Sequence, residues 1–253
     1  ATPPAKGEFL SLIKYYKAML KKLGVTVVTG KCAAAEEIIG AGYDAVVTAT
    51  GVTPKTINLP VSEEGIEIMT ANDVLAGNAI AGKDVVVVGG GSVGCETAQY
   101  LAERGSLSPA QLHFLMSRHA ETPEELQRLV DRTDRNVSIV EILKKIGQGF
   151  DMGTGWPVLD DLARLGVKNH TSSKILDVKK DRVIIEETGK DGVRRDIEIP
   201  CDTIVLAVGS NSNNALYQAL EGKVEKLYNL GDSLKVGKII DAIHQAENLS
   251  MEI

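Results

Sequence analysis

Three glycines in the segment VVVVGGGSVGCETAQYLAERG, residues 85–105, have the spacing of a dinucleotide-binding turn. Gly89-x-Gly91-x-x-Gly94 directly follows an apolar run and opens a helical pattern. In such a turn the first glycine permits a tight bend and the second lets the backbone approach a pyrophosphate. The third allows the helix to pack closely on the strand. The segment therefore predicts a strand, a phosphate-binding turn and a helix.

The start of that helix adds to the predicted site. The first turn of a helix leaves backbone N–H groups without partners in the helix, and the helix dipole adds a partial positive charge. Because the dipole contributes only about 0.3–2 kcal/mol, we expect most of the affinity to come from several amides, those of Gly91, Ser92, Val93 and Gly94 among them. A turn of the same shape that binds nothing remains the alternative.

The stretch after the predicted helix carries two further helix starts. Ser108-Pro109 and Thr122-Pro123 each combine an N-cap residue with proline at the first helical position. We predict that residues 106–136 form a helical hairpin, inserted before the next strand of the unit, VSIVEIL.

Glu141 is the candidate ligand of the adenosine ribose. An acidic residue normally stands about 20 positions after the glycine motif, at the end of the next strand. The 47 positions between Gly94 and Glu141 shrink to 16 once the 31 residues of 106–136 are set aside. A carboxylate there accepts hydrogen bonds from a ribose 2′-OH and repels a 2′-phosphate, by roughly 4 kcal/mol at about 4 Å. We therefore predict that the chain binds NADH about 100- to 1000-fold more tightly than NADPH. The positive charges of Lys144 and Lys145, which follow closely, would reduce this preference. A solvated glutamate at a strand end is the alternative.

Composition limits the class of protein. The chain has 253 residues, with 43% apolar and 25% charged residues and a net charge of −6. The net negative charge argues against a nucleic-acid partner. No apolar stretch reaches the roughly 18 residues of a membrane span. With no signal peptide and three widely spaced cysteines, the sequence predicts a cytoplasmic protein without a disulfide framework.

The remaining reactive residue types form no site in the sequence. His113, His119, His170 and His244 have no cysteine or acid at metal-ligand spacing, so we predict no metal site. Cys95 directly follows the last glycine of the motif, and we interpret it as a small packing residue.

The order of elements indicates an α/β fold. Strands and helices alternate around the glycine motif, whereas 167–200 has the pattern of an antiparallel meander with a hairpin at Asp191-Gly192. The other predicted elements are helices at 8–23, 70–77 (capped by Thr70 or Asn72), 158–165 and 236–253, a short helix or turn at 33–42, and strands at 25–30, 43–51, 201–209 and 226–232.

Four motifs together resemble the C-terminal half of 2-enoate reductase and 2,4-dienoyl-CoA reductase, flavin enzymes related to old yellow enzyme. They are the glycine segment 85–105, GFDMGTGW, CDTIVLAVGSNSNNAL and LYNLGDSLKVGKIIDAIHQA. The resemblance implies a Rossmann-like NAD(H)-binding domain at 80–210, with the insertion 106–136. This domain would be inserted into an incomplete FAD-binding-type α/β domain formed by 1–79 and 211–253.

The resemblance also implies cofactor contacts. Thr50-Gly51 and Gly231-Asp232 match positions that contact FAD, Glu96 matches an acidic position near the nicotinamide, and Gly209 closes a strand beside the cofactor. In such a reductase, hydride would pass from NADH to FAD, and the electrons would then pass through an iron–sulfur cluster to FMN and an activated alkene. Because cofactors do this chemistry, we name no catalytic acid or base.

The chain lacks several parts that the resemblance leads one to expect. These are an N-terminal barrel with FMN, a cysteine cluster for an iron–sulfur centre, and the first strand–glycine–helix unit of the FAD domain. The sequence therefore predicts a fragment, inactive alone, whose partners are the dinucleotides and the barrel and FAD half of its parent chain. Whether it forms a homo-oligomer stays open.

Two alternatives differ in class from this interpretation. The chain could belong to another flavoprotein with two dinucleotide sites, such as an amine dehydrogenase or an NADH oxidase. It could also be a nucleotide-binding or assembly module without turnover, acting through the insertion 106–136.

Overall fold

The computed structural model describes residues 3, 6–151 and 153–253. The chain divides into two compact units. Unit 1 comprises Ala1–Ser11 and Thr56–Gly209, as far as these residues are described, and unit 2 comprises Leu12–Lys55 and Ser210–Ile253. The larger segment of unit 1, Thr56–Gly209, thus lies in sequence between the two segments of unit 2.

A parallel sheet forms the centre of unit 1. Its strands lie in the order β3 (Glu67–Thr70), β10 (Thr203–Leu206), β4 (Asp84–Val88), β5 (Asn136–Val140) and β6 (Lys168–His170). Each neighbouring pair is parallel. The predicted Rossmann-like α/β fold is confirmed.

Strand β4 is apolar from Val85 to Val88 because both faces of the sheet are covered. Val85 and Val87 pack in one core with residues of three helices, whereas Val86 and Val88 belong to a second core on the opposite face. Side chains alternate between the two faces of a strand, so the buried part of a doubly covered strand is a nearly continuous apolar run. The helices are α3 (Ala71–Ala76), α4 (Ser92–Ala102) and α7 (Gly155–Arg164).

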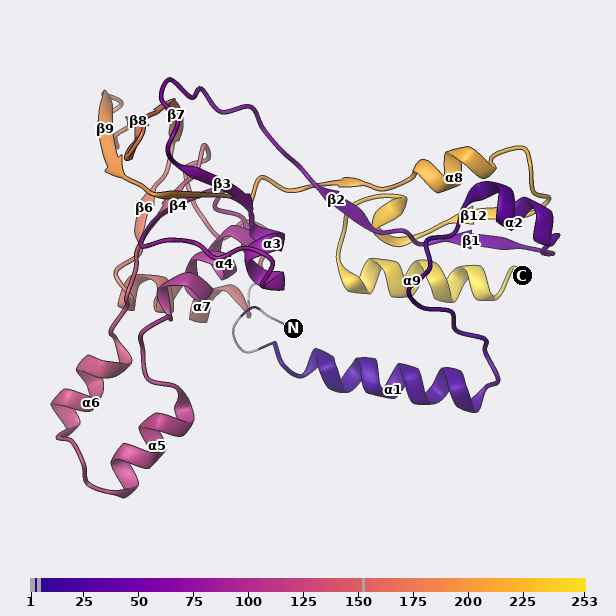
Figure 1. The fold of residues 1–253 in the computed structure, drawn as a ribbon, viewed down its shortest axis with the longest axis horizontal. Helices are drawn as coiled ribbons and strands as arrows, with labels where there is room; N and C mark the ends of the chain where they lie inside the picture. Colours follow the sequence, from indigo (N-terminus) through magenta and orange to yellow (C-terminus); the bar gives the residue numbers. More distant parts are fainter. Residues whose placement is uncertain (1–2, 4–5, 152) are drawn as a thin grey trace. The chain divides into compact units, whose positions relative to one another are not determined.

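The second core lies under an antiparallel meander, as the sequence predicted. Its strands are β7 (Ser173–Val178), β8 (Arg182–Thr188) and β9 (Arg194–Pro200). Gly192, in the turn between the last two strands, has a φ of +76°, which glycine adopts without steric cost. Figure 1 shows the meander and the helices α4 and α7 on opposite sides of the sheet.

The insertion contains the two predicted helices, α5 (Pro109–Ser117) and α6 (Pro123–Val130), which project from the rest of unit 1 (Figure 1). Ser108 forms a capping box with Gln111, and the Thr122 hydroxyl accepts a hydrogen bond from the amide of Glu125. Thr70 caps α3 in the same way, as one of the two predicted N-caps.

Unit 2 contains two short pairs of strands and most of the remaining helices. Strand β1 (Val46–Thr48) is parallel to β12 (Leu227–Asn229), and β2 (Val52–Pro54) is antiparallel to β11 (Ser210–Ser212). The helices are α1 (Phe9–Lys22), which begins in unit 1, α2 (Ala35–Ala41), α8 (Ala215–Leu220), the 3₁₀ helix η1 (Gly231–Ser233) and α9 (Ile239–Ser250).

Two sequence-based expectations differ from the structure. The strand predicted at 25–30 does not form, since these residues are exposed and have no neighbouring strand in the described chain. Residues 56–79, assigned by resemblance to the FAD-type domain, lie in unit 1 because β3 pairs with β10. In the described part of the chain, no helix is both long and apolar enough to cross a membrane.

Truncating Leu162 should destabilise unit 1. Leu162 on α7 is fully buried, at 0% exposure, whereas Leu159 on the same helix is 37% exposed. Because Leu162→Ala leaves a cavity in the core, we expect it to lower the free energy of unfolding by about 2–5 kcal/mol in urea. Leu159→Ala is the matched control and should cost clearly less. Equal losses would show that α7 does not pack as described.

Candidate functional site

The glycine turn lies at the point where the strand order of the sheet reverses. Strand β4 is flanked by β5 on one side and by β10, from much later in the chain, on the other. The loops after β4 and β10 therefore meet, and the amide of Ala207 donates to the carbonyl oxygen of Val88 at 2.8 Å. In open α/β sheets, ligands bind in the crevice beyond the carboxyl ends of the strands at such a point.

The three motif glycines differ in whether the protein's own packing requires a glycine at that position. Gly89 has a φ of +104°, and a Cβ added there would lie 2.5 Å from the oxygen of Ala207. A Cβ on Gly94 would lie 1.9 Å from the oxygen of Gly89, so helix and strand could not pack as they do. A Cβ on Gly91 would meet only the oxygen of Gln148, at an ordinary 3.6 Å. The space at Gly91 is open, and it fits a diphosphate drawn close to the backbone.

Some backbone amides of the turn already donate a hydrogen bond within the protein, and others do not. Among the described residues, the amides of Gly91, Val93 and Gly94 make no hydrogen bond with another group, so they can serve an anion as predicted. The amide of Ser92 cannot, because it donates to the carbonyl oxygen of Gln148 at 2.8 Å. This corrects the expectation for the Ser92 amide, whereas a cofactor contact of Ser92 through another group stays a prediction.

Glu141 directly follows β5 and reaches the glycine turn. Its Oε2 accepts from the amide of Gly90 at 2.5 Å, and its Oε1 accepts from the amide of Leu143 at 2.8 Å. The residue is only 7% exposed. Since an ionised carboxylate has about four acceptor positions, it retains capacity for a ribose hydroxyl. Its hold on the turn is a role that the sequence did not indicate.

The contact between Glu141 and the turn also explains why residue 90 is a glycine. A Cβ there would lie 3.1 Å from Cβ of Glu141 and 2.6 Å from Cγ2 of Ile146. The glycine motif does not require a glycine at this position, so the close approach of the two side chains accounts for it.

Glu96 lies on α4, and its side chain is 12% exposed. Its Oε1 accepts from Nζ of Lys6 at 2.6 Å. A carboxylate removed from water needs such a partner, and Lys6, 90 positions earlier, had no signal in the sequence.

The residues expected to contact FAD gather at one edge of unit 2. Strands β1 and β12 are parallel and in register at Thr48 and Asn229, so the segments that follow them meet at the same edge. Asp232 accepts from the amide of Gly237 at 3.0 Å through Oδ1, and the amide of Gly231 donates to Gln245 at 2.6 Å.

Two more of the expected cofactor residues have left-handed backbones. Gly51 has a φ of +73° and Gly209, at the end of unit 1, a φ of +92°, and a Cβ on either would meet nothing within 4 Å. This open space fits a close ligand. Thr50, by contrast, donates through its hydroxyl to the carbonyl oxygen of Asn213 at 2.5 Å.

Cys95 on α4 is fully buried, and its thiol donates to the carbonyl oxygen of Gly90 at 3.4 Å. Burial raises the pKa of the Cys95 thiol to about 11 and that of Cys201 to about 12. Cys32 is exposed. Because the thiolate is the reactive form, Cys95 has the packing role that the sequence indicated.

The family model for pyridine nucleotide-disulphide oxidoreductases matches residues 8–231. The chain is 40% identical over 252 residues to a metal reductase of Desulforamulus reducens, covering 98% of this chain and 37% of that protein. It is 32% identical to an NADH oxidase of Thermoanaerobacter brockii, covering 99% and 34%. A cinnamate reductase of Clostridium sporogenes is 28% identical, with 99% and 33% covered. The chain thus spans about a third of the length of these relatives.

The fold is also found in solved structures. A 2-naphthoyl-CoA reductase complex superposes with a TM-score of 0.77 at 24% identity, over 100% of this chain and 33% of that one. A histamine dehydrogenase from Rhizobium sp. 4-9 has a TM-score of 0.65 at 16% identity, over 88% and 31%.

Substituting two motif glycines should separate folding from binding. Gly94→Ala places a methyl group against the Gly89 carbonyl, and we expect it to cost about 3 kcal/mol of unfolding free energy. Gly91→Ala should leave stability nearly unchanged, because its φ of −68° suits any residue. It should weaken NADH binding at least about tenfold by fluorescence titration, since the methyl group would occupy ligand space. Unchanged NADH binding by Gly91→Ala would contradict the site.

Thiol labelling should distinguish the three cysteines. At pH 8, a disulfide reagent should label Cys32 rapidly in the folded chain, because Cys95 and Cys201 are buried and their raised pKa values keep them protonated. All three should react after unfolding. Mass spectrometry identifies the labelled residue, and rapid labelling of Cys95 in the folded chain would contradict its packing role.

Proposed function

The chain belongs to the pyridine nucleotide-disulphide oxidoreductase family, and from this premise we propose that it is the NADH-binding, electron-input part of a flavoprotein oxidoreductase. Members of the family bind FAD and NAD(P). In the proposed reaction, FAD would accept hydride from NADH, and its electrons would pass through an iron–sulfur cluster to FMN for reduction of an activated alkene of 2-enoate or dienoyl-CoA type.

The observation that carries the proposal is the open space at Gly91. The protein tolerates a Cβ there, at 3.6 Å from its nearest neighbour. The amides of Gly91, Val93 and Gly94 make no hydrogen bond among the described residues, so they are available as donors to an anion. A turn built only for folding would need glycine at the first and last motif positions alone. The carboxylate of Glu141 beside the same turn supports NADH as the dinucleotide.

The residues of the chain bind and orient, whereas the cofactors supply the redox chemistry. We assign the diphosphate to the glycine turn and the adenosine ribose to Glu141. Glu96, held by Lys6, is assigned to the nicotinamide side by the resemblance of its position. No side chain in the described residues is assigned as a catalytic acid or base.

FAD is assigned to unit 2, with Gly51 and Asp232 as its expected contacts. The relatives are about three times as long as the aligned region. We propose that the FMN barrel, the iron–sulfur cluster and the remaining FAD contacts belong to further parts of a longer parent chain. These parts are the proposed partners of the described chain.

The electron acceptor has two further candidates in addition to the alkene. The cinnamate reductase relative supports an enoate, whereas the metal reductase at 40% identity favours a metal ion as substrate. The NADH oxidase at 32% identity favours oxygen. Anaerobic NADH oxidation by the parent enzyme, measured with cinnamate or with a ferric chelate, separates the alkene from the metal ion, and aerobic turnover tests oxygen.

A module without turnover is the remaining alternative. Calorimetric titration of the chain with NADH, ADP and FAD tests it. Binding of ADP as tight as that of NADH would favour a nucleotide-dependent assembly role, whereas tighter NADH binding supports electron input.

The discrimination between NADH and NADPH tests the role of Glu141. We expect the chain to bind NADH about 100-fold more tightly than NADPH, because the buried carboxylate repels a 2′-phosphate. Glu141→Gln should reduce that ratio about tenfold in fluorescence titrations, with unfolding measured in parallel since the carboxylate also holds two amides. Glu198→Gln, on exposed β9, is the control and should keep the ratio. Equal binding of both dinucleotides by the unsubstituted chain would remove Glu141 from the ribose site.

A further inference from the structure

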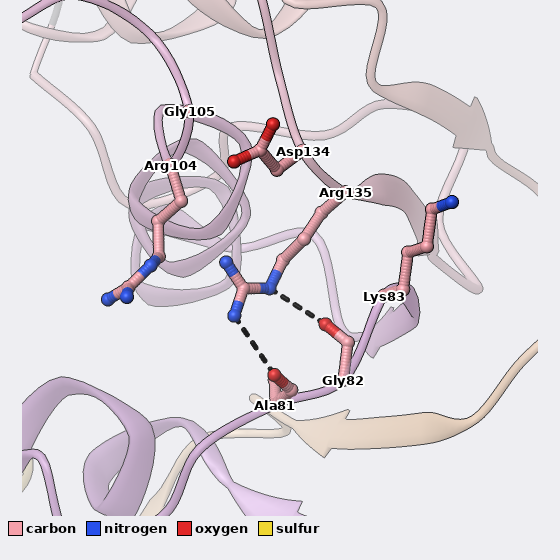
Figure 2. A pocket seen from close by; sticks show the side chains of 7 residues that line it. All are labelled: Ala81, Gly82, Lys83, Arg104, Gly105, Asp134 and Arg135. Carbon is pink, nitrogen blue, oxygen red and sulfur yellow. Dashed lines mark hydrogen bonds between the residues drawn. The ribbon is translucent and has the colours of Figure 1, made fainter.

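A cavity lies in unit 1, at the end of β4 opposite to the glycine turn. It has a volume of about 430 Å³ and is formed by three short segments, 81–83, 104–105 and 134–135 (Figure 2). Lys83 precedes the first residue of β4, whereas Gly89 follows the last. A strand of this length spans about 17 Å, so the cavity is separate from the dinucleotide site.

The cavity is lined by more positive than negative groups. Lys83, Arg104 and Arg135 contribute three cations, and Asp134 is the one acid in the lining. The carboxylate of Asp134 is directed to Gly105 and to Arg132, whose Nη2 lies 3.2 Å from Oδ1. In the described chain, the side chains of Lys83 and Arg104 make no ion pair.

Arg135 is held in a fixed orientation. Its Nε donates to the carbonyl oxygen of Gly82 at 2.7 Å, and its Nη2 donates to that of Ala81 at 3.0 Å. In Figure 2 the third nitrogen points away from these carbonyls, toward the side of the cavity where Arg104 lies. A guanidinium fixed in this way loses little conformational freedom when it binds an anion.

The two arginines influence each other electrostatically. Burial lowers the pKa of Arg135 and the positive charge of Arg104 lowers it further, whereas Asp134, Tyr100 and Asp202 raise it by smaller amounts. Two cations close enough to repel each other are favourable sites for an anion, because its charge relieves the repulsion.

We propose that this cavity binds a phosphate group, carried by inorganic phosphate or by a small polar phosphate ester. Guanidinium groups match the oxygens of phosphate with paired N–H donors, and lysine adds a point charge. The volume lies within the range of small-molecule sites and exceeds what a phosphate alone fills. Ala81 is the only apolar side chain in the lining, so the rest of an ester would be hydrophilic.

The cavity also lies at the base of the inserted hairpin. The segment that contains helices α5 and α6 begins after Gly105 and ends before Asp134. Its two ends are joined by a hydrogen bond, in which the carbonyl oxygen of Arg104 accepts from the amide of Asp134 at 2.9 Å. An anion in the cavity therefore contacts both ends of the insertion at once.

The test is an amide NMR titration of the full chain with inorganic phosphate and with methyl phosphate. Saturating ADP-ribose occupies the glycine turn, and sodium chloride keeps the ionic strength constant. We expect saturable shifts at the amides of Gly82, Lys83 and Gly105. Tighter binding of methyl phosphate would support an ester as the ligand, and equal or weaker binding would support free phosphate.

Side-chain variants localise the binding. Arg104→Ala and Lys83→Ala should each weaken phosphate binding about tenfold, since each removes a charged donor. Arg194→Ala, on β9 with its side chain 70% exposed, is the matched control and should bind as the unsubstituted chain does. Arg135 is not replaced, because it holds two carbonyl groups. Shifts that do not saturate, that scatter over the surface, or that persist in Arg104→Ala would overturn the proposal.

Discussion

The contact between Gly94 and the carbonyl oxygen of Gly89 is the constraint on which the dinucleotide site depends. Helix α4 approaches the end of β4 so closely that a single added carbon at Gly94 would lie 1.9 Å from that oxygen. Only this approach places the first turn of the helix directly at the carboxyl edge of the sheet. The amides of Gly91 and Val93, which have no hydrogen-bond partner among the described residues, belong to this start of the helix, where free N–H groups are available to an anion.

The turn is held from three sides before any ligand binds. The loop after β10 contacts Gly89, the carboxylate of Glu141 accepts from Gly90, and the carbonyl of Gln148 accepts from Ser92. The two hydrogen bonds satisfy backbone donors that would otherwise have no partner, and the packing contact fills space beside Gly89. A turn fixed in this way loses little conformational freedom on binding, so more of the interaction energy contributes to affinity. Glu141 therefore contributes to the site through the backbone as well as through its charge.

The sequence predicted the features that depend on neighbours a few residues apart. The glycine turn, the N-caps at Ser108 and Thr122 and the hairpin at Gly192 are set by local backbone geometry, so the pattern was sufficient. The prediction of a strand at 25–30 was wrong because a strand needs hydrogen-bond partners from another strand, and a local sequence pattern does not show whether these exist. The ion pair of Glu96 joins residues 90 positions apart and the contact of Glu141 with Gly90 joins residues 51 apart. No periodicity in the sequence encodes such distances.

Helix α4 connects the two anion sites, but its two ends differ in what they offer. At its start, bare backbone amides are the donors, which suits a diphosphate that must come close to the chain. At its end, the helix dipole is negative, so a cation such as Arg104 just beyond it is stabilised even without a ligand. That effect explains one cation and not three, because Lys83 and Arg135 come from segments before β4 and β5. Their convergence on Arg104, with only one acid among the four charged residues of the lining, is what distinguishes a binding cavity from an ordinary helix end.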